Sequence, residues 1–359
     1  MISSYLRPES ALPTDFDRAT LIGRVELPGA GAALVQVRPD GVYDLSRLAP
    51  TCADLLELAD PAAAVRAHRG ERLGGVKDLL ANTSCDARVL DAPHFLAPCD
   101  LQPIKAAGVT FVESMLERVI EEQAGGDPAK AQSVRRQVVA VIGENLGAVK
   151  PGSPEAARLK QILIEQDMWS QYLEVGIGPD AEVFTKSQPM SAVGTGAEIG
   201  LHPASSWNNP EPEIVLAVDS RGRTLGATMG NDVNLRDFEG RSALLLGKSK
   251  DNTASCAIGP VIRLFDEHFG IGDIRRCELA MKVQGPDGFV LFLGTMFAPT
   301  QDRHGPGQGF THVIGDIVTI ATPRLGTLAN RVNTSDRVAP WTYGTRALMR
   351  DLARRGLLG

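Results

Sequence analysis

The chain has 359 residues, which is more than a single hydrophobic core usually holds, so its length favours two domains. Its formal net charge of -6 argues against nucleic acid as the main partner. No apolar run reaches the ~18 residues of a membrane span, and the N-terminal residues lack the basic start and apolar core of a secretory signal. We therefore expect neither a membrane partner nor export.

The cysteines and histidines form no ligand motif. Five cysteines are scattered along the chain and none is spaced as C-x-x-C, a pattern that predicts reduced thiols in a cytoplasmic protein. The six histidines are equally dispersed. We interpret them as surface or supporting residues more readily than as metal ligands.

The first part of the chain predicts a small domain. Residues 20–46 alternate between apolar and polar positions, with turns at a Pro-Gly and an Asp-Gly pair, which is typical of a short antiparallel meander. A helix is predicted over 51–58, with Thr51 as its N-cap. We predict that residues 1–95 form a small N-terminal α/β domain.

Residues 96–359 are predicted to form the catalytic domain, which begins with a strand ending near Phe111. Amphipathic segments then predict a helical insertion over about 113–171. Ser114 stands at the N-cap of its first helix, and Glu117 stands at the third helical position, as in a capping box.

Strand patterns dominate the chain from residue 172 onward. Short apolar runs bounded by glycine and proline predict strands at 172–178, 181–186, 198–203, 213–218, 224–229, 277–284, 289–297, 316–323 and 326–332. A helix is expected at 259–269 and another at 340–358. The predicted fold class is α+β, with a mixed and mainly antiparallel architecture.

Three carboxylates stand at the ends of two neighbouring predicted strands. Glu211 and Glu213 flank Pro212, and residues i and i+2 of a strand point to the same face. Asp232 ends the next strand. Like charges this close repel each other unless a cation neutralises them or one takes up a proton. Three carboxylates without an imidazole suit Mg²⁺ or Mn²⁺ rather than zinc, and a solvated strand face is the alternative.

Several motifs recur in a characteristic order along residues 97–335. They are Glu-Pro-Glu-Ile-Val at 211–215, Asn-Asp at 231–232, Arg-Asp at 236–237, Lys at 250 before Thr-Ala-Ser-Cys, Leu-Gly-Thr at 293–295, and Gly-Asp-Ile-Val at 315–318. This combination resembles the fumarylacetoacetate hydrolase superfamily. Within it, the residues of the motifs are most similar to those of the bacterial 2-keto-3-deoxy-pentonate (arabinonate or xylonate) dehydratases. The resemblance implies a β-roll or sandwich of the fumarylacetoacetase C-terminal type and a homodimer or homotetramer.

The resemblance also implies a metal site. The metal triad of the superfamily falls on Glu211, Glu213 and Asp232, and its basic lysine falls on Lys250. Lys248, two residues away, competes for the role of that lysine. In the dehydratases a bound Mg²⁺ or Mn²⁺ is expected to hold the carboxylate and oxo group of a 2-keto acid and to stabilise its enolate.

Further residues are implied as substrate contacts. The substrate-binding arginine of the superfamily falls on Arg236, and a threonine that contacts the substrate falls on Thr295. Ser114 and Lys186 are also candidates for substrate binding. Each has a structural alternative: Arg236 could pair with a neighbouring carboxylate, Thr295 could satisfy the backbone, and Lys186 could be peripheral.

One departure from the superfamily bears on the reaction. Its carbon–carbon bond hydrolases activate water with a helix-borne His and Glu, whereas here Ser114 stands at the His position and Glu117 at the Glu position. A dehydratase needs no water nucleophile. Lys250 is then the candidate base for the C3 proton, and we expect its pKa to be lowered towards neutrality. Glu117 is the candidate acid for the C4 hydroxyl, unless it only caps its helix.

The leading expectation is therefore a hydro-lyase that converts a 2-keto-3-deoxy-pentonate to 2,5-dioxopentanoate in non-phosphorylated pentose catabolism. The alternatives are a hydrolase that cleaves a carbon–carbon bond of a β-diketo acid, and a non-catalytic sugar-acid binding protein. The superfamily normally has a longer passage between the strands that meet at 283–289, so we also expect that a segment is missing there.

Overall fold

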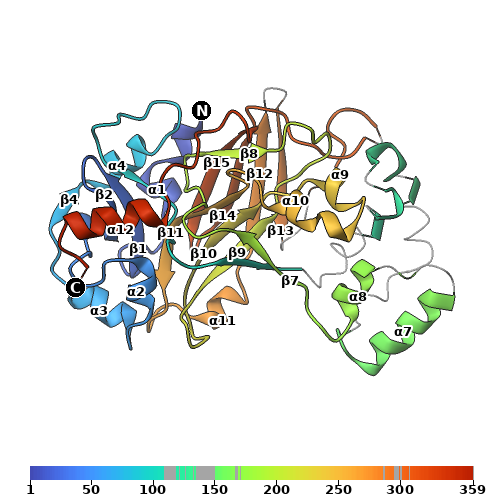
Figure 1. The fold of residues 1–359 in the computed structure, drawn as a ribbon, viewed down its shortest axis with the longest axis horizontal. Coiled ribbons are helices and arrows are strands. Elements are labelled where there is room, and N and C mark those ends of the chain that lie inside the picture. Colours follow the sequence, from blue (N-terminus) through green and yellow to red (C-terminus); the bar gives the residue numbers. More distant parts are fainter. Residues whose placement is uncertain are drawn as a thin grey trace.

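Two β-sheets form the centre of the molecule (Figure 1). The computed structural model describes residues 1–358 except 109–118, 121, 126, 132, 135–149, 166–168, 170, 286–287, 295–298, 300 and 307. Among the described residues, one sheet has eight strands in the order β4-β3-β2-β1-β11-β10-β9, with β5 paired to β1. A second sheet has five strands in the order β13-β12-β14-β15-β8, and β6 and β7 form a separate ribbon.

The strands of the larger sheet are β1 (Leu21–Leu27), β2 (Gly31–Arg38), β3 (Gly41–Asp44), β4 (Arg72–Gly74), β5 (His94–Phe95), β9 (Pro212–Val218), β10 (Thr224–Asp232) and β11 (Cys256–Leu264). The others are β6 (Ile104–Ala107), β7 (Val183–Ser187), β8 (Glu198–Leu201), β12 (Leu279–Gly285), β13 (Gly288–Gly294), β14 (Ile317–Thr322) and β15 (Gly326–Thr334). Pairings between these strands are antiparallel except β15 with β8. The α+β, mainly antiparallel class predicted from the sequence is confirmed.

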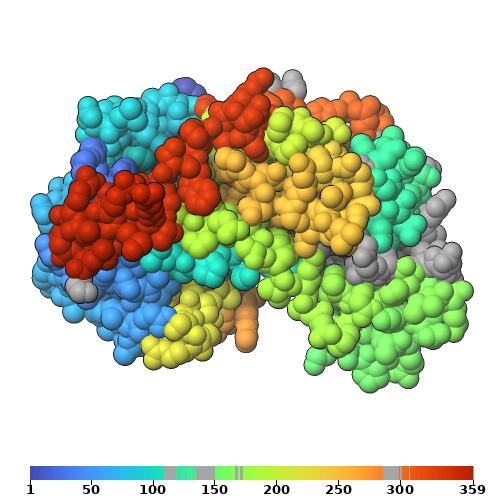
Figure 2. All heavy atoms as spheres, in the orientation of Figure 1, coloured from blue at the N-terminus to red at the C-terminus, as the bar shows by residue number. Residues whose placement is uncertain are grey.

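Short helices decorate the sheets. They are η1 (Ile2–Tyr5), α1 (Pro8–Ala11), α2 (Cys52–Leu56), α3 (Pro61–Ala67), α4 (Val76–Asn82), α7 (Pro154–Glu165), α8 (Gln171–Ile177), α9 (Arg236–Glu239), η3 (Ala243–Leu245), α10 (Leu246–Lys250), α11 (Ile271–Ile274) and α12 (Thr345–Arg354). Helix α12 lies against the N-terminal strands, and α7 and α8 form a lobe at the opposite end of the molecule (Figures 1 and 2). No helix in the described part of the chain is long and apolar enough to cross a bilayer.

The predicted N-terminal meander is confirmed by β1, β2 and β3. The register of β1 with β2 runs from Leu21 opposite Val37 to Leu27 opposite Gly31, and the apolar positions of both strands are buried. Thr51 caps α2 as predicted, because its side chain accepts a hydrogen bond of 3.0 Å from the backbone N–H of Asp54.

The first strand also pairs with the strand region that carries the candidate site. Leu21 and Ile22 of β1 lie opposite Arg263 and Ile262 of β11, and β11 pairs in turn with β10. The N-terminal strands and the strands β9–β11 therefore belong to one hydrogen-bonded sheet. The division of the chain at residue 95 stays a prediction.

Two segments differ from their predicted structure. Residues 172–178 were expected to form a strand but lie in α8, where Leu173 and Ile177, four residues apart, are buried against α7; tertiary packing outweighs their strand propensity. Residues 259–269 were expected to form a helix, but most of them lie in β11. Every residue of β11 is buried, and a strand buried on both faces gives a continuous apolar run that periodicity does not distinguish from a helix.

The expectation of a missing segment at 283–289 falls partly on residues 286–287, which lie outside the described residues, so it stays a prediction. Strands β12 and β13 pair from Val283 opposite Val290 to Gly285 opposite Gly288. The two strands are therefore antiparallel neighbours on both sides of this position. The predicted helix at 340–358 is shorter than expected, because α12 begins at Thr345 and ends at Arg354.

Candidate active site

The predicted carboxylates lie at one end of the β9–β10 pair. The backbone N–H of Asp232 donates a 2.9 Å hydrogen bond to the carbonyl of Glu211, and Glu213 lies opposite Gly230. Because side chains alternate along a strand, Glu211, Glu213 and Asp232 occupy the same face of the pair. Gly230 places no side chain between them, and the side chain of Val215 occupies the space where its Cβ would lie.

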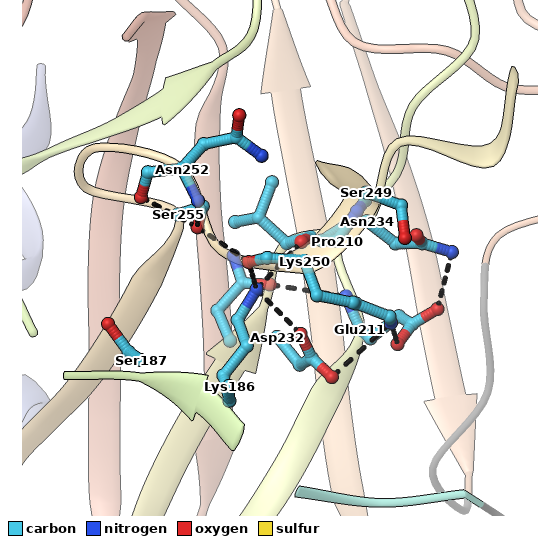
Figure 3. A network of polar contacts seen from close by, with 12 residues as sticks. Lys186, Ser187, Pro210, Glu211, Asp232, Asn234, Ser249, Lys250, Asn252 and Ser255 are labelled. Atoms are coloured by element: carbon cyan, nitrogen blue, oxygen red, sulfur yellow. Dashed lines mark hydrogen bonds and ion pairs between the residues drawn. The ribbon is translucent and has the colours of Figure 1, made fainter. Parts of the chain in front are cut away.

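Lys250 lies between two of these carboxylates (Figure 3). Its ammonium Nζ is 2.5 Å from Glu211 Oε2 and 3.3 Å from Asp232 Oδ2. The lysine side chain is fully buried, and the ring of Phe184 lies on another side with its centroid 5.8 Å from Nζ. A buried ammonium requires partners of opposite charge, and the two carboxylates supply them.

A second buried lysine holds the other oxygen of Asp232. Lys186 Nζ lies 2.8 Å from Asp232 Oδ1, as an ion pair rather than an aligned hydrogen bond. The same ammonium donates to the carbonyls of Val233, at 3.0 Å, and of Lys250. Each oxygen of Asp232 therefore faces a different lysine.

The orientation of Glu211 is fixed from its other side. Asn234 Nδ2 donates a 3.0 Å hydrogen bond to Glu211 Oε1 and a further one to Glu239 Oε2. The backbone N–H of Glu211 donates to Asn231 Oδ1 at 3.1 Å. The two asparagines and Glu239 are buried. Both carboxylate oxygens and the main chain of Glu211 are thus held in place.

The two lysines also set the charge of Asp232. Burial alone would raise the pKa of this carboxyl, but the ammonium groups of Lys186 and Lys250 outweigh burial and lower its pKa below the usual value. Asp232 is therefore an anion at neutral pH, as a metal ligand must be.

The donor set fits a hard divalent cation. In the described part of the chain no three acidic, histidine or cysteine side chains already surround one point as metal ligands do, since Lys250 occupies the space between Glu211 and Asp232. However, the three carboxylates exceed the two lysines by one negative charge, and all their donor atoms are oxygen. Oxygen donors are those that Mg²⁺ and Mn²⁺ prefer.

Four predicted site residues remain, and the structure describes one of them, Arg236. Arg236 is buried on α9, and its guanidinium lies over the ring of Trp207, 4.6 Å from the centroid. The neighbouring Asp237 accepts hydrogen bonds of 2.8 Å from Ser205 Oγ and from the backbone N–H of Ser206, so it is held by another segment. The remaining three predicted residues lie outside the described residues, namely Ser114, Glu117 and Thr295.

Three residues of the site were not singled out from the sequence. Asn231, Asn234 and Glu239 all belong to the run Asn-Asp-Val-Asn-Leu-Arg-Asp-Phe-Glu that supplies Asp232 and Arg236. Each is a buried polar side chain, and buried polar groups are normally hydrogen-bonded to something specific. The density of polar residues next to an apolar strand was the signal that could have identified them.

A cavity of about 490 Å³ adjoins the carboxylates. Lys186, Glu213 and Asp232 line it together with the polar residues Gln102, Lys105, Thr228 and Asn231, and apolar side chains of β9, β11 and β6 complete the lining. A cavity of this size lies in the range of small-molecule sites. The carboxylate end is therefore accessible to a small ligand.

The curated relatives of this chain are described as dehydratases of sugar acids. No family model matches the chain. A 2-dehydro-3-deoxy-D-arabinonate dehydratase from Saccharolobus solfataricus is 31% identical over a region that covers 42% of this chain and 58% of that protein, so the chain matches little more than half of this relative. A probable 2-keto-3-deoxyxylonate dehydratase from Haloferax volcanii is 27% identical, with coverage of 84% and 95%.

Solved structures agree in fold. A 2-keto-3-deoxy-D-arabinonate dehydratase complexed with magnesium and 2,5-dioxopentanoate has a TM-score of 0.53 and 20% identity, covering 88% of this chain and 99% of that one. The chain has the fold of the 2-keto-3-deoxy sugar acid dehydratases. The apo form of that enzyme has the same TM-score at 19% identity. The resemblance to the dehydratases that was predicted from the sequence is confirmed.

Proposed function

We propose that the chain is a Mg²⁺-dependent hydro-lyase that converts a 2-keto-3-deoxy-pentonate to 2,5-dioxopentanoate. The observation that carries this proposal is the buried Lys250, whose amino group lies within contact of both Glu211 and Asp232. A basic group next to a carboxylate metal site is what abstraction of a proton beside an oxo group requires. The curated relatives named above are dehydratases of such acids.

Each described residue then has a part in the reaction. Glu211, Glu213 and Asp232 hold the cation, which supplies Lewis acidity at the substrate's oxo group and positive charge beside the lysine. Lys250 Nζ removes the C3 proton, and the electron pair left on C3 forms the enolate. The enolate expels the C4 hydroxyl, which leaves as water after gaining a proton.

The source of that last proton is assigned to Glu117, which follows from the sequence alone. A carboxyl group in the neutral form is a suitable acid for a leaving hydroxyl. The loss of water creates a double bond between C3 and C4. Loss of a C5 proton with return of a proton at C3 then gives an enol with a double bond between C4 and C5, and this enol becomes the aldehyde when its hydroxyl loses a proton and C4 gains one. Atoms balance, because one water leaves and no other reactant is needed.

A product analysis separates the proposal from its alternatives. The chain is incubated with 2-keto-3-deoxypentonate and Mg²⁺, and the product is identified by mass. Loss of one water supports the dehydratase. Release of a shortened acid instead identifies the carbon–carbon hydrolase, and an unchanged substrate that nevertheless binds identifies a non-catalytic sugar-acid binding protein. Either of the last two results overturns the proposal.

A cytoplasmic location and assembly as a homodimer or homotetramer complete the proposal. Both rest on the resemblance of the sequence and on the metabolic role of the acids that the relatives act on. Size-exclusion chromatography with light scattering measures the assembly directly, and a mass equal to one chain, 38.3 kDa, would contradict it.

A further inference from the structure

Lys186 is the second cation of the site, and its contacts differ from those of Lys250. An ammonium carries three N–H donors. Lys186 donates two of them to the carbonyls of Val233 and Lys250, and its charge forms an ion pair with Asp232 Oδ1. The side chain is only 2% exposed. All three of these contacts of the Lys186 ammonium are therefore made within the protein.

The three contacted oxygens belong to two different segments. Asp232 and Val233 lie where the chain leaves β10, and the carbonyl of Lys250 lies at the end of α10. Lys186 itself comes from β7, far away in sequence. One ammonium therefore ties the main chain of the base, Lys250, to Asp232 and to the carbonyl of the residue after Asp232 (Figure 3).

The carbonyl of Lys250 receives a second hydrogen bond. Ser255 Oγ also donates to the carbonyl of Lys250, at 2.8 Å. That carbonyl thus receives two hydrogen bonds from buried donors, whereas the amino group of Lys250 contacts the two carboxylates that would bind the cation. The main chain of Lys250 is held by these two hydrogen bonds. Its amino group, in contrast, contacts carboxylates that it would exchange for the substrate when the cation binds.

We propose that Lys186 is a positioning residue for Lys250 and does not contact the substrate. Its ammonium aims the base at the reacting carbon by tying the Lys250 main chain to Asp232. This inference rests on the proposed function, since it assumes that Lys250 removes the C3 proton.

Deuterium exchange isolates that proton transfer. In 2-oxopentanoate the C4 hydroxyl is absent, so dehydration cannot follow, and the C3–H bond breaks and reforms with a deuteron from D₂O. The loss of the C3 signal is followed by proton NMR with Mg²⁺ present. The full-length Lys186→Met variant is expected to exchange ~100-fold more slowly at saturating acid, the scale of a small misplacement of a reacting group.

The half-saturating acid concentration distinguishes positioning from substrate binding. We expect it to change less than ~3-fold in Lys186→Met, since a residue that acts only on the transition state lowers the rate without weakening ground-state binding. Mg²⁺ affinity, measured by calorimetry, is expected to stay equal or to increase, because a positive charge next to Asp232 is lost. A wild-type rate with ~10-fold weaker acid binding would overturn the inference.

Two further variants control for the loss of any lysine and for the loss of positive charge alone. Lys77→Met changes an exposed lysine on α4 that does not line the cavity, and it should exchange at the wild-type rate. Lys186→Arg keeps the charge, but a planar guanidinium cannot contact three oxygens around one nitrogen, so it should be intermediate. Wild-type exchange by a folded Lys186→Arg overturns positioning, and absent exchange in the wild type overturns the proposed function itself.

Discussion

The molecule contains two buried charge networks that are built in opposite ways. In the loop between β13 and β14, Arg303 meets Asp316 with two parallel contacts, Nη1 to Oδ2 at 2.5 Å and Nη2 to Oδ1 at 2.6 Å. One guanidinium thus binds both oxygens of one carboxylate in a bidentate arrangement. At the ends of β9 and β10, by contrast, Lys250 divides one ammonium between Glu211 and Asp232.

The contrast concerns charge as well as geometry. The Arg303–Asp316 pair is balanced, and the backbone N–H of Val313 adds a 2.9 Å hydrogen bond to Asp316 Oδ2. The site has more carboxylates than lysines. A balanced, bidentate pair is complete within the chain, whereas an excess of one sign in a buried place requires an added ion. Buried charge therefore has to be judged by its balance, and its presence alone does not indicate a functional site.

Removal of Glu213 should give the largest effect of all, because it removes one of the three carboxylates proposed to hold the cation. For Glu213→Ala we expect Mg²⁺ binding to fall by more than the ~10–100-fold that loss of a merely supporting residue causes, and turnover to disappear. Calorimetry and the product assay measure both. Glu267→Ala, which removes an exposed carboxylate elsewhere, is the matched control. Undiminished Mg²⁺ binding in Glu213→Ala would remove this residue from the metal site.

Removal of Lys250 should affect turnover but not the cation. In Lys250→Met the base is lost, and we expect turnover to fall by ~10²–10⁴-fold, the usual contribution of general base catalysis. Mg²⁺ binding should persist or improve, because Glu211 and Asp232 lose their competing partner. Lys248→Met is the control, since this neighbouring lysine lies at His202, with 3.0 Å between Nζ and Nε2. Near-normal turnover in Lys250→Met would exclude it as the base.

Opening the balanced pair should affect stability alone. Asp316→Ala leaves the guanidinium of Arg303 without the carboxylate that it grips, and breaking a buried pair in this way costs ~3–5 kcal/mol of unfolding free energy. Urea unfolding measures the loss, and kcat of the folded protein should stay unchanged. If kcat fell while stability held, the network between β13 and β14 would have to be counted as part of the active site.

The smallest expected effect is a dependence of stability on pH. Burial lowers the pKa of His312, and Asp316 opposes this only in part. Burial would raise the pKa of Asp316, but hydrogen bonds from Arg303 and His312 hold it far below its usual range. Both folded-state pKa values are depressed, so their contributions are present above the unfolded-state values and are lost as the pH falls.

Stability should therefore decline below pH ~6.5, where an unfolded histidine begins to take up a proton. Unfolding in urea at pH 7.5 and at pH 5.5 measures the decline. His312→Gln should flatten it between these two values, and exposed His268→Gln should not. An equal decline in the wild type and in His312→Gln would mean that other groups govern it.

The sequence predicted those elements whose information is local. The meander at 20–46 alternates with a period of two, and it folds as three paired strands. Residues 256–264 were misjudged because a strand buried on both faces has no alternation to detect. Residues 172–177 were misjudged because their partners in α7 decide their conformation.

The same distinction between local and long-range information applies to the candidate site. Glu211, Glu213 and Asp232 could be placed together because strand alternation and neighbouring strand ends bring them to one face. The three contacts of Lys186 could not be predicted, since they join β7, β10 and α10, which are distant in sequence. The hold of Asn234 on Glu211 likewise depends on how the chain turns after β10. Long-range convergence of this kind has no local signature.

The pairing of β1 with β11 has a consequence for how the chain can be handled. Without the N-terminal strands, the outer side of β11 would present a row of unpaired backbone amides and carbonyls next to the strand that carries Asp232. Such an exposed edge invites strands from neighbouring molecules and so favours aggregation. Residues 1–27, which include β1, thus cover the edge of the strands that carry the candidate site. Shortened versions of the protein should therefore keep these residues.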